Sequence, residues 1–187
     1  MRIISGRFKG KKLVQPIDRN TRPLKDMTKE SIFNLFLHSK KLSIKFEKSK
    51  VLDLFSGSGS FGIECISRYA KEVTFVEDYS PAVKILKKNL QSLKLNSGYK
   101  IIEKNIFDLN ECSGLERNYD LIFADPPYKE EKIDELLSII KNLNFLKKTG
   151  LFVLHRNKLD KDILTENFSK VEERIYGISK IIFLKSK

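Results

Sequence analysis

Residues 51–64 read VLDLFSGSGSFGIE, a short apolar strand followed by a glycine-rich turn and the beginning of a helix. Gly57, Gly59 and Gly62 have the spacing G-x-G-x-x-G, and Glu77 lies 20 residues after the first of them. Such glycines let the backbone turn tightly beside a ligand, and a carboxylate after the second strand can bind both ribose hydroxyls of an adenosine. The stretch therefore predicts an α/β, Rossmann-like fold that binds an adenosine-containing ligand.

The acidic residue before the glycines bears on which ligand this is. The glycine turn alone fits NAD and S-adenosylmethionine equally well, since both carry an adenosine. Asp53 lies in the strand just before the turn, where a carboxylate suits a charged amino group better than a pyrophosphate. We therefore expect S-adenosylmethionine as the cofactor; a plain tight turn capped by Asp53 is the alternative.

Strand-like runs alternate with amphipathic stretches from residue 50 onward. Strands are expected over residues 50–55, 72–77, 99–102, 119–124, 150–155, 170–176 and 179–184. Helices are expected over residues 25–38, from the glycine turn to about residue 69, from a cap at Ser80 with Pro81 in first position, and through Leu136, Leu137, Ile140 and Leu143. The alternation predicts a mostly parallel seven-stranded sheet, and the short turn at Gly177 predicts an antiparallel hairpin at its edge.

Two of these helices carry apolar side chains at helical spacing, which predicts that they face a core. They are Met27, Ile32, Phe33 and Phe36 in the first helix, and Ala82, Ile85, Leu86, Leu90 and Leu93 in the helix that follows Ser80.

The tetrapeptide Asp125-Pro126-Pro127-Tyr128 follows the strand expected over residues 119–124. An exocyclic amine of guanine or adenine is a poor nucleophile, because its lone pair is delocalised into the ring. The carboxylate of Asp125 and the main-chain carbonyl of Pro126 can accept hydrogen bonds from that amine and free the lone pair, while the prolines keep both acceptors in place. Tyr128 offers a flat face to an unpaired or flipped base. The motif predicts methyl transfer to a base amine; an ordinary proline-stiffened loop is the alternative.

Positive charge is concentrated at the start of the chain, whose total net charge is +12. Residues 1–50 hold 14 Lys or Arg against 4 Asp or Glu, whereas residues 51–187 hold 22 against 20. A basic segment beside a nearly neutral domain is typical of proteins that bind backbone phosphates, although a solvated lysine surface is the alternative. We expect residues 1–45 to form a basic RNA-binding extension of short β pieces and a helix. It would pack on a methyltransferase domain of residues 46–187 in a single globular unit.

Several classes of protein are disfavoured by composition. No apolar run is long enough to cross a bilayer and the start lacks the apolar core of a signal peptide, so we expect a cytoplasmic protein without a membrane partner. Cys65 and Cys112 have neither disulfide nor zinc-site spacing; we expect both to be buried apolar residues and expect no metal.

Taken together, residues 51–64, Glu77 and DPPY resemble the class I amino-methyltransferases. MRIISGRFKGKKL at residues 1–13 and RPLKDMTKESIFNLF at residues 22–36 extend the resemblance, over nearly the whole chain, to the RsmD family of bacterial 16S rRNA guanine-N2 methyltransferases. That resemblance implies methylation of guanine 966, in reference rRNA numbering. We expect a small-subunit assembly particle as the substrate, with free rRNA and the finished subunit as alternatives, and we expect a monomer because nothing in the sequence demands more.

The resemblance also implies roles for individual residues. The cofactor pocket would be lined by Asp53, Ser56, Gly57, Gly59, Glu77, Asp78, Asn105 and Ile106, and the target-base pocket by Asp125, Pro126, Pro127 and Tyr128. The RNA backbone would be held by Arg2, Arg7, Lys9, Lys11, Lys12 and Arg22.

Two positions depart from the family's pattern. Asn105 stands where an acidic residue usually contacts the adenine amine; its amide oxygen can accept the same bond, and a turn residue is the alternative. His155 and Arg156 replace a frequent Glu near the fifth strand. We interpret His155 as a strand-end histidine rather than a general base and assign no catalytic role there.

Three other functions compete with this one. An adenine-N6 methyltransferase has an equivalent catalytic loop, but one acting on DNA would usually need a target-recognition region for which 187 residues leave little room. An NAD-dependent oxidoreductase would need a catalytic Tyr-Lys, His or Cys constellation that we do not find. A non-catalytic RNA-binding module would leave the glycine turn, Glu77 and DPPY as coincidences.

Overall fold

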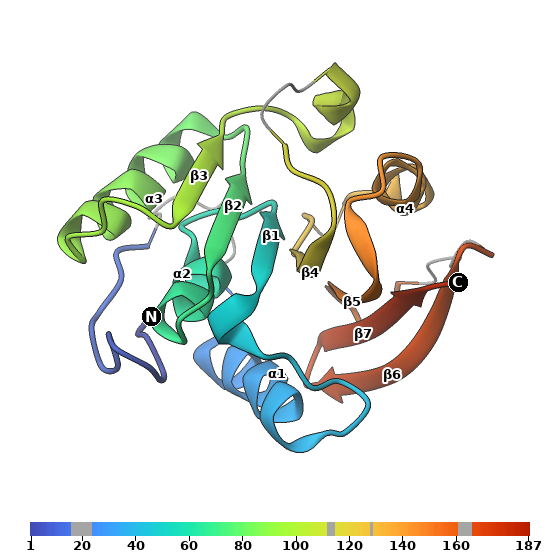
Figure 1. Cartoon of the computed structure of the whole chain (residues 1–187), viewed down its shortest axis with the longest axis horizontal. Coiled ribbons are helices and arrows are strands. Elements are labelled where there is room, and N and C mark those ends of the chain that lie inside the picture. Colours follow the sequence, from blue (N-terminus) through green and yellow to red (C-terminus); the bar gives the residue numbers. More distant parts are fainter. Residues whose placement is uncertain (16–23, 112–114, 128, 161–165) are drawn as a thin grey trace.

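The computed structural model describes residues 1–15, 24–111, 115–127, 129–160 and 166–187. Its centre is a seven-stranded sheet with the order β3-β2-β1-β4-β5-β7-β6 (Figure 1). The strands are β1 (Lys50–Leu54), β2 (Glu72–Val76), β3 (Tyr99–Ile102), β4 (Tyr119–Ala124), β5 (Leu146–Asn157), β6 (Phe168–Tyr176) and β7 (Ser179–Ser186). β1 to β5 pair with one another in parallel, while β7 is antiparallel to both β5 and β6. The predicted Rossmann-like sheet with its antiparallel hairpin is therefore confirmed.

Helices cover both faces of the sheet. They are α1 (Asp26–His38), α2 (Ser60–Ser67), α3 (Ser80–Ser92) and α4 (Ile133–Asn142), with the short 3₁₀ helices η1 (Phe46–Lys48) and η2 (Ile106–Glu111). Consecutive strand residues face opposite sides, so Val51 joins a core formed with α1, α2 and α3, and Leu52 a core formed with α4 and η2. This is the three-layer arrangement of an open α/β sheet.

Three details of the helices differ from the predictions. Met27 is 77% exposed instead of facing the core, because it is nine residues from the buried Phe36, and two and a half helical turns put the two on opposite sides of α1. Ser80 is the first residue of α3 and makes no side-chain cap, and Ile85 is only partly buried. Leu143 lies just beyond the end of α4.

The N-terminal hairpin, residues 1–14, lies against α2 and α3. In place of two strands it has a single antiparallel bridge between Arg2 and Lys12, and its Ile3 and Leu13 belong to the core shared with α1, α2 and α3. The buried Glu64 of α2 accepts hydrogen bonds from the backbone N–H groups of Ile4 and Ser5, at 2.7 and 3.0 Å. The hairpin is thus built into the core rather than appended to it.

Asn89 of α3 connects this hairpin to the glycine turn. Its amide accepts a hydrogen bond from the Val14 N–H at 2.8 Å and donates to the carbonyls of Val14 and Ser58, each at 3.0 Å. The end of the hairpin and the glycine turn therefore share one buried side chain. No helix in the described ranges is long and apolar enough to cross a membrane.

Candidate active site

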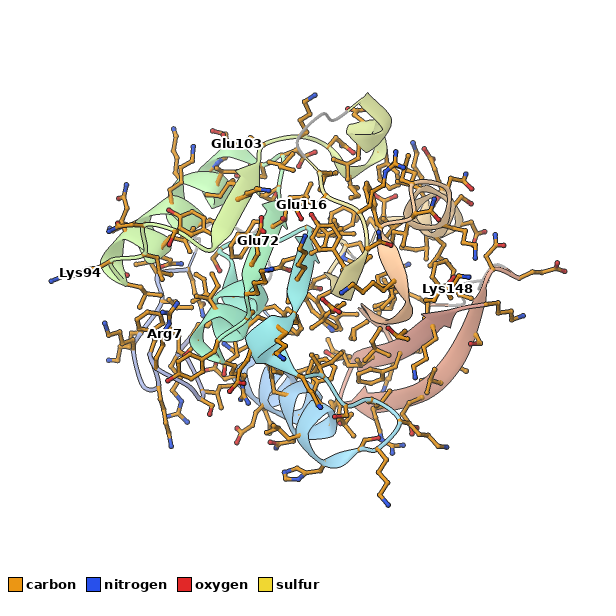
Figure 2. The ribbon with its side chains drawn as sticks, in the orientation of Figure 1. Arg7, Glu72, Lys94, Glu103, Glu116 and Lys148 are labelled. Atoms are coloured by element: carbon orange, nitrogen blue, oxygen red, sulfur yellow. The ribbon has the colours of Figure 1, made fainter. Side chains whose placement is uncertain are left out.

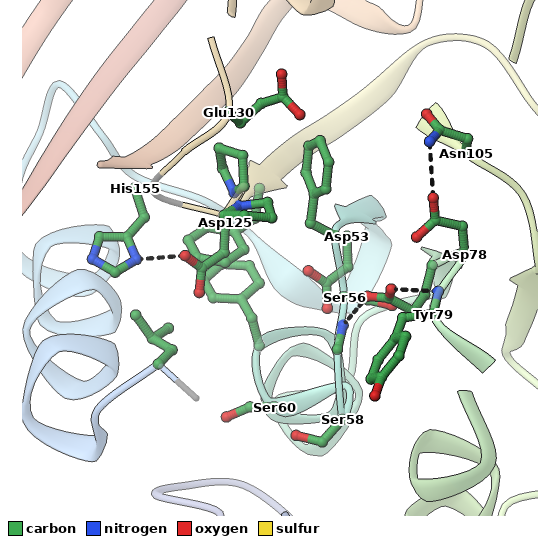
Figure 3. Close-up of a pocket in the computed structure, with 18 of the residues that line it drawn as sticks. Asp53, Ser56, Ser58, Ser60, Asp78, Tyr79, Asn105, Asp125, Glu130 and His155 are labelled. Carbon is green, nitrogen blue, oxygen red and sulfur yellow. Dashed lines mark hydrogen bonds and ion pairs between the residues drawn. The ribbon is translucent and has the colours of Figure 1, made fainter. Parts of the chain in front are cut away.

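A cavity of about 740 Å³ opens where the parallel strands end (Figure 3). Its walls come from the segments that follow β1, β2, β3 and β4, from β5, and from the residues before α1. They include Leu24, Lys25, Asp53, Phe55, Ser56, Gly57, Ser58, Ser60, Phe61, Glu77, Asp78, Tyr79, Asn105, Phe107, Phe123, Asp125, Pro126, Pro127, Lys129, Glu130, His155 and Ser179. Ligand sites of open α/β sheets form at this edge, and the volume is in the usual range of about 300–1,000 Å³.

The three glycines of the turn have different structural roles. Gly57 has φ +54° and lines the cavity, and a Cβ there would have no atom within 4 Å, so a ligand can approach its backbone. Gly59 has φ +80°, but a Cβ would lie 2.3 Å from Leu86, and one on Gly62 would lie 2.3 Å from Phe75. Gly59 is not among the residues that line the cavity, and the absence of a side chain lets it pack against Leu86; its contact with a cofactor remains a prediction.

Glu77 is held against the glycine turn. Its two carboxylate oxygens accept hydrogen bonds from the N–H groups of Gly57 and Tyr79, at 2.7 and 2.9 Å. Burial raises the pKa of Glu77 above its ordinary value, and the two N–H groups oppose that shift. The carboxylate is therefore fixed in the wall of the cavity, directly after β2.

Asp53 lies deeper, with 1% of its surface exposed. Its Oδ2 accepts a hydrogen bond from the Gly62 N–H at 2.9 Å. Burial raises the pKa of Asp53 well above its ordinary value, and the charges of Asp125 and Glu77 raise it further. A buried carboxylate with two acidic neighbours is well suited to a ligand that brings positive charge.

Asn105 and Asp78 meet at the ends of β3 and β2. The Asn105 amide donates a hydrogen bond to Asp78 Oδ2 at 2.8 Å, and its oxygen accepts one from the Phe107 N–H at 3.0 Å (Figure 3). Asn105 is thus a turn residue that also lines the cavity, so its contact with a cofactor remains a prediction. Ile106 is buried beside this turn and is not among the lining residues.

The proline motif directly follows β4. Asp125, Pro126 and Pro127 line the cavity, and Tyr128 lies outside the described residues. Beneath them Phe61 and Phe123 stack with ring centroids 3.9 Å apart. The sheet therefore brings the predicted acceptor Asp125 into the same cavity as Asp53 and Glu77.

His155 also faces this cavity, where we had assigned no catalytic role. Its Nδ1 lies 2.7 Å from Asp125 Oδ1 (Figure 3). The pairing joins β4 to β5 across 30 residues of sequence, so no local motif could reveal it. The one feature of the sequence that could have indicated a role for His155 is its position at the carboxyl end of a central strand.

The predicted RNA-binding residues lie outside the cavity. Arg2, Arg7, Lys9, Lys11 and Lys12 are exposed on the N-terminal hairpin, while Arg22 and Cys112 fall outside the described residues. Cys65 is buried on α2 as a free thiol, as predicted.

Similarity to known proteins identifies the family. A family model described as "Conserved hypothetical protein 95" matches residues 1–185. The ribosomal RNA small subunit methyltransferase D of Haemophilus influenzae is 34% identical over 180 residues, covering 95% of this chain and 90% of that protein. The chain belongs to the RsmD family. A putative rRNA methyltransferase of Bacillus subtilis, YlbH, is 32% identical over 189 residues and is covered completely, as is this chain.

Solved structures agree with this membership of the RsmD family. A putative methylase from Haemophilus influenzae has a TM-score of 0.78 at 32% identity, with 99% of this chain and 97% of that chain covered. A putative methyltransferase from Escherichia coli has a TM-score of 0.83 over 100% of this chain and 98% of that one, and at 24% identity it supports the fold alone. The protein is a methyltransferase with the class I, Rossmann-like fold.

The cavity of this RsmD-family protein fits the cofactor that methyltransferases usually bind, S-adenosylmethionine. Ser56 Oγ is buried at its wall with no hydrogen-bond partner among the described residues, and the backbone of Gly57 is open to a ligand. A polar atom left in this way calls for a bound group. No cluster of His, Cys, Asp and Glu that could hold a metal ion is found in the described ranges.

Proposed function

We propose that this protein transfers a methyl group from S-adenosylmethionine to the exocyclic N2 amine of a guanine in small-subunit 16S rRNA. The names of its Haemophilus influenzae and Escherichia coli relatives, ribosomal RNA small subunit methyltransferase D, support the choice of rRNA. Guanine N2 and the position 966 come from the family resemblance of the sequence.

The observation that carries the proposal is the position of Asp125. It follows β4 directly, lines the cavity shared with Asp53 and Glu77, and is followed by Pro126 and Pro127. A carboxylate there can accept one hydrogen bond from a base amine while the Pro126 carbonyl accepts the other. Both bonds draw the lone pair of the nitrogen out of the ring π system and aim it into the cavity.

Three carboxylates of the cavity would have different roles, two toward the cofactor and one toward the target base. Bound S-adenosylmethionine supplies an electrophilic methyl group on a sulfonium. Glu77 is positioned to bind the ribose hydroxyls, Asp53 to bind the amino group, and Asp125 to accept from the amine. Asp78 and Asn105, with Ile106 behind them, would form the adenine end of the cavity.

The substrate would reach the cavity as an unpaired or flipped base, because the acceptors lie below the cavity mouth. Tyr128 would stack on that base, and the basic N-terminal hairpin, together with Arg22, would bind backbone phosphates. No general base is required, since methylation makes the amine acidic enough to lose its proton to water. We propose a monomer that acts in the cytoplasm on a small-subunit assembly particle.

The test is transfer from radiolabelled S-adenosylmethionine to small ribosomal subunits, free 16S rRNA and duplex DNA, each prepared from cells without this enzyme, followed by nucleoside analysis. We expect N2-methylguanosine in the ribosomal substrates and none in DNA. Formation of N6-methyladenine would contradict the proposed substrate, but it would agree with the proposed chemistry of the proline motif. No transfer to any substrate would favour a non-catalytic RNA-binding module.

Asp125→Ala tests the catalytic loop. We expect it to abolish turnover while the affinities for cofactor and RNA stay within about tenfold, because the lost acceptor acts mainly in the transition state. Asp120→Ala is the matched control, since Asp120 lies at the other end of β4 and binds Lys50 and Lys147. It should cost stability but little turnover. Retained methylation by Asp125→Ala would contradict the assigned role.

A further inference from the structure

The Asp125–His155 pair is not used by the proposed chemistry. His155 is 6% exposed and Asp125 partly buried, and a 2.7 Å separation between Nδ1 and Oδ1 is that of a strong, charge-assisted hydrogen bond. The other histidine of the sequence, His38, is exposed at the end of α1. A buried imidazole aimed at the carboxylate that should bind the target amine calls for a role.

We propose that His155 is a positioning residue for Asp125. Its Nδ1–H donates to Oδ1, which fixes the rotation of the carboxylate and turns Oδ2 toward the target amine. This proposal rests on the proposed function, because it assumes that Asp125 accepts from the amine. Without the bond, the carboxylate would rotate freely about its terminal torsion, whose preference is broad.

The Asp125–His155 hydrogen bond also counteracts electrostatic repulsion within the cavity. Asp125 shares the cavity with Asp53 and Glu77, and their charges act on one another. Three carboxylates in one site repel, and a carboxylate without a donor would turn away from the others. The N–H of His155 supplies a donor on the side of Asp125 that faces β5. The other charged side chains that line the cavity in the described ranges are Lys25, Lys129, Glu130 and Asp78.

The next residue of β5 holds the other end of the same loop. The buried side chain of Arg156 donates from Nη2 to the Glu130 carbonyl at 3.0 Å, and its Nε lies 3.3 Å from Asp160 Oδ2. Consecutive residues of one strand thus bind Asp125 and Glu130, which bracket the proline motif. β5 acts as the support against which the catalytic loop is fixed.

Three substitutions separate a hydrogen-bonding role from a packing role. The amide of an asparagine can place an N–H near the position of Nδ1, a glutamine amide reaches the position of Nε2, and leucine fills the space with no donor. We expect His155→Leu and His155→Gln to lower kcat about 10- to 100-fold, and His155→Asn to stay within about threefold of wild type. KM for rRNA and cofactor affinity should change less than about threefold in all three, since Asp125 acts in the transition state. Equal kcat values for Asn and Leu would overturn the proposal.

A second measurement is independent of turnover. Because the sequence has two histidines, imidazole ¹⁵N NMR resolves them, and His38→Gln assigns the spectrum. We expect His155 as the Nδ1–H tautomer, with a resonance that shifts in Asp125→Asn while that of His38 does not. An Nε2–H tautomer, or a spectrum unchanged by Asp125→Asn, would overturn the proposal. Failure of the proposed function is seen separately, as wild-type protein that methylates no rRNA, and the NMR result still decides the pair.

Discussion

The buried environment of Asp53 disfavours the ionised form of its carboxyl group. Burial raises its pKa well above the ordinary value of about 4, so the folded protein retains a proton that the unfolded chain releases. The unfolded state therefore binds fewer protons between the two pKa values, and the free energy of unfolding falls as pH rises through that window. Ionising the buried Asp53 therefore lowers stability, and in the proposed function this charge binds the amino group of the cofactor.

The substitution Asp53→Asn tests whether the buried charge lowers the stability of the protein and contributes to cofactor binding. Its amide oxygen can still accept from the Gly62 N–H, while the charge is gone. We expect the variant to gain stability relative to wild type as pH rises above about 4, the ordinary pKa of the carboxyl group, and to bind cofactor at least tenfold more weakly. Urea denaturation across this pH range and cofactor titration measure the two effects. Asp134→Asn, an exposed carboxylate in the first turn of α4, is the control. A stability difference that does not grow with pH would contradict the assigned burial cost.

Single residues were predictable where a local motif carries them. Asp53, Glu77 and Asp125 could be predicted because each follows or lies in a strand whose carboxyl end is recognisable from the sequence. His155 could not, because its partner is 30 residues away and side-chain pairing across strands leaves no periodic signal. The sequence cannot separate the two reasons for a glycine at position 59, because a positive φ and a close ligand contact both favour glycine.

At the scale of elements, Gly6 fastens the N-terminal hairpin to α2. It has φ +82°, and a Cβ there would lie 1.9 Å from the Ser67 carbonyl oxygen. Gly10 in the same hairpin has φ +84° but no neighbour within 4 Å of a Cβ. Alanine substitutions at Gly6 and Gly10 therefore separate two contributions to the loss of stability. One is the strain of a left-handed backbone, and the other is a steric clash with Ser67.

We expect Gly10→Ala to destabilise the protein by about 1 kcal/mol, the usual cost of a left-handed non-glycine residue. Gly6→Ala should cost at least twice as much and weaken RNA binding, because the hairpin must move away from α2. Thermal unfolding and RNA titration of the two variants give the comparison. Equal losses would mean that the close approach to Ser67 contributes nothing.

Elements were predicted better than their packing. All seven strands were expected, and β3 and β4 have the predicted bounds. β5 begins four residues earlier than predicted. Lys147, Lys148 and Thr149 are polar, and Leu146 pairs with Tyr119 beyond a register shift against β4. We expected residues 1–45 to pack on the domain, but the sequence does not identify Glu64 and Asn89, whose hydrogen bonds to residues 1–14 span about 60 and 75 residues. Such long-range side-chain bonds have no sequence signature.

At the scale of the whole molecule, most of the net positive charge belongs to residues 1–50. Figure 2 shows Arg7 of the N-terminal hairpin and Lys148 of β5 near opposite sides of the molecule. If the hairpin binds phosphates, a charge reversal there and one at Lys148 have different effects although both lower the net charge from +12 to +10.

We expect Lys9→Glu to weaken RNA binding several-fold and to reduce the slope of log K against log salt concentration by about one phosphate contact, roughly 0.7–0.9. Lys148→Glu should leave that slope unchanged. Filter binding over a salt series measures both. Identical slopes for the two variants would mean that overall charge, and not the hairpin, attracts the RNA.

The sheet order has a consequence for how this chain folds during its own synthesis. β6 is made before β7, yet among the described strands β7 alone pairs with it, and β7 also separates it from β5. The emerging chain therefore carries β6 as a strand without a partner until β7 has left the exit tunnel, and β5 keeps an open edge for the same interval. Open strand edges are where nascent chains join one another wrongly. A chaperone that shelters residues 146–176 would raise the yield of folded enzyme more than one that shelters the glycine turn.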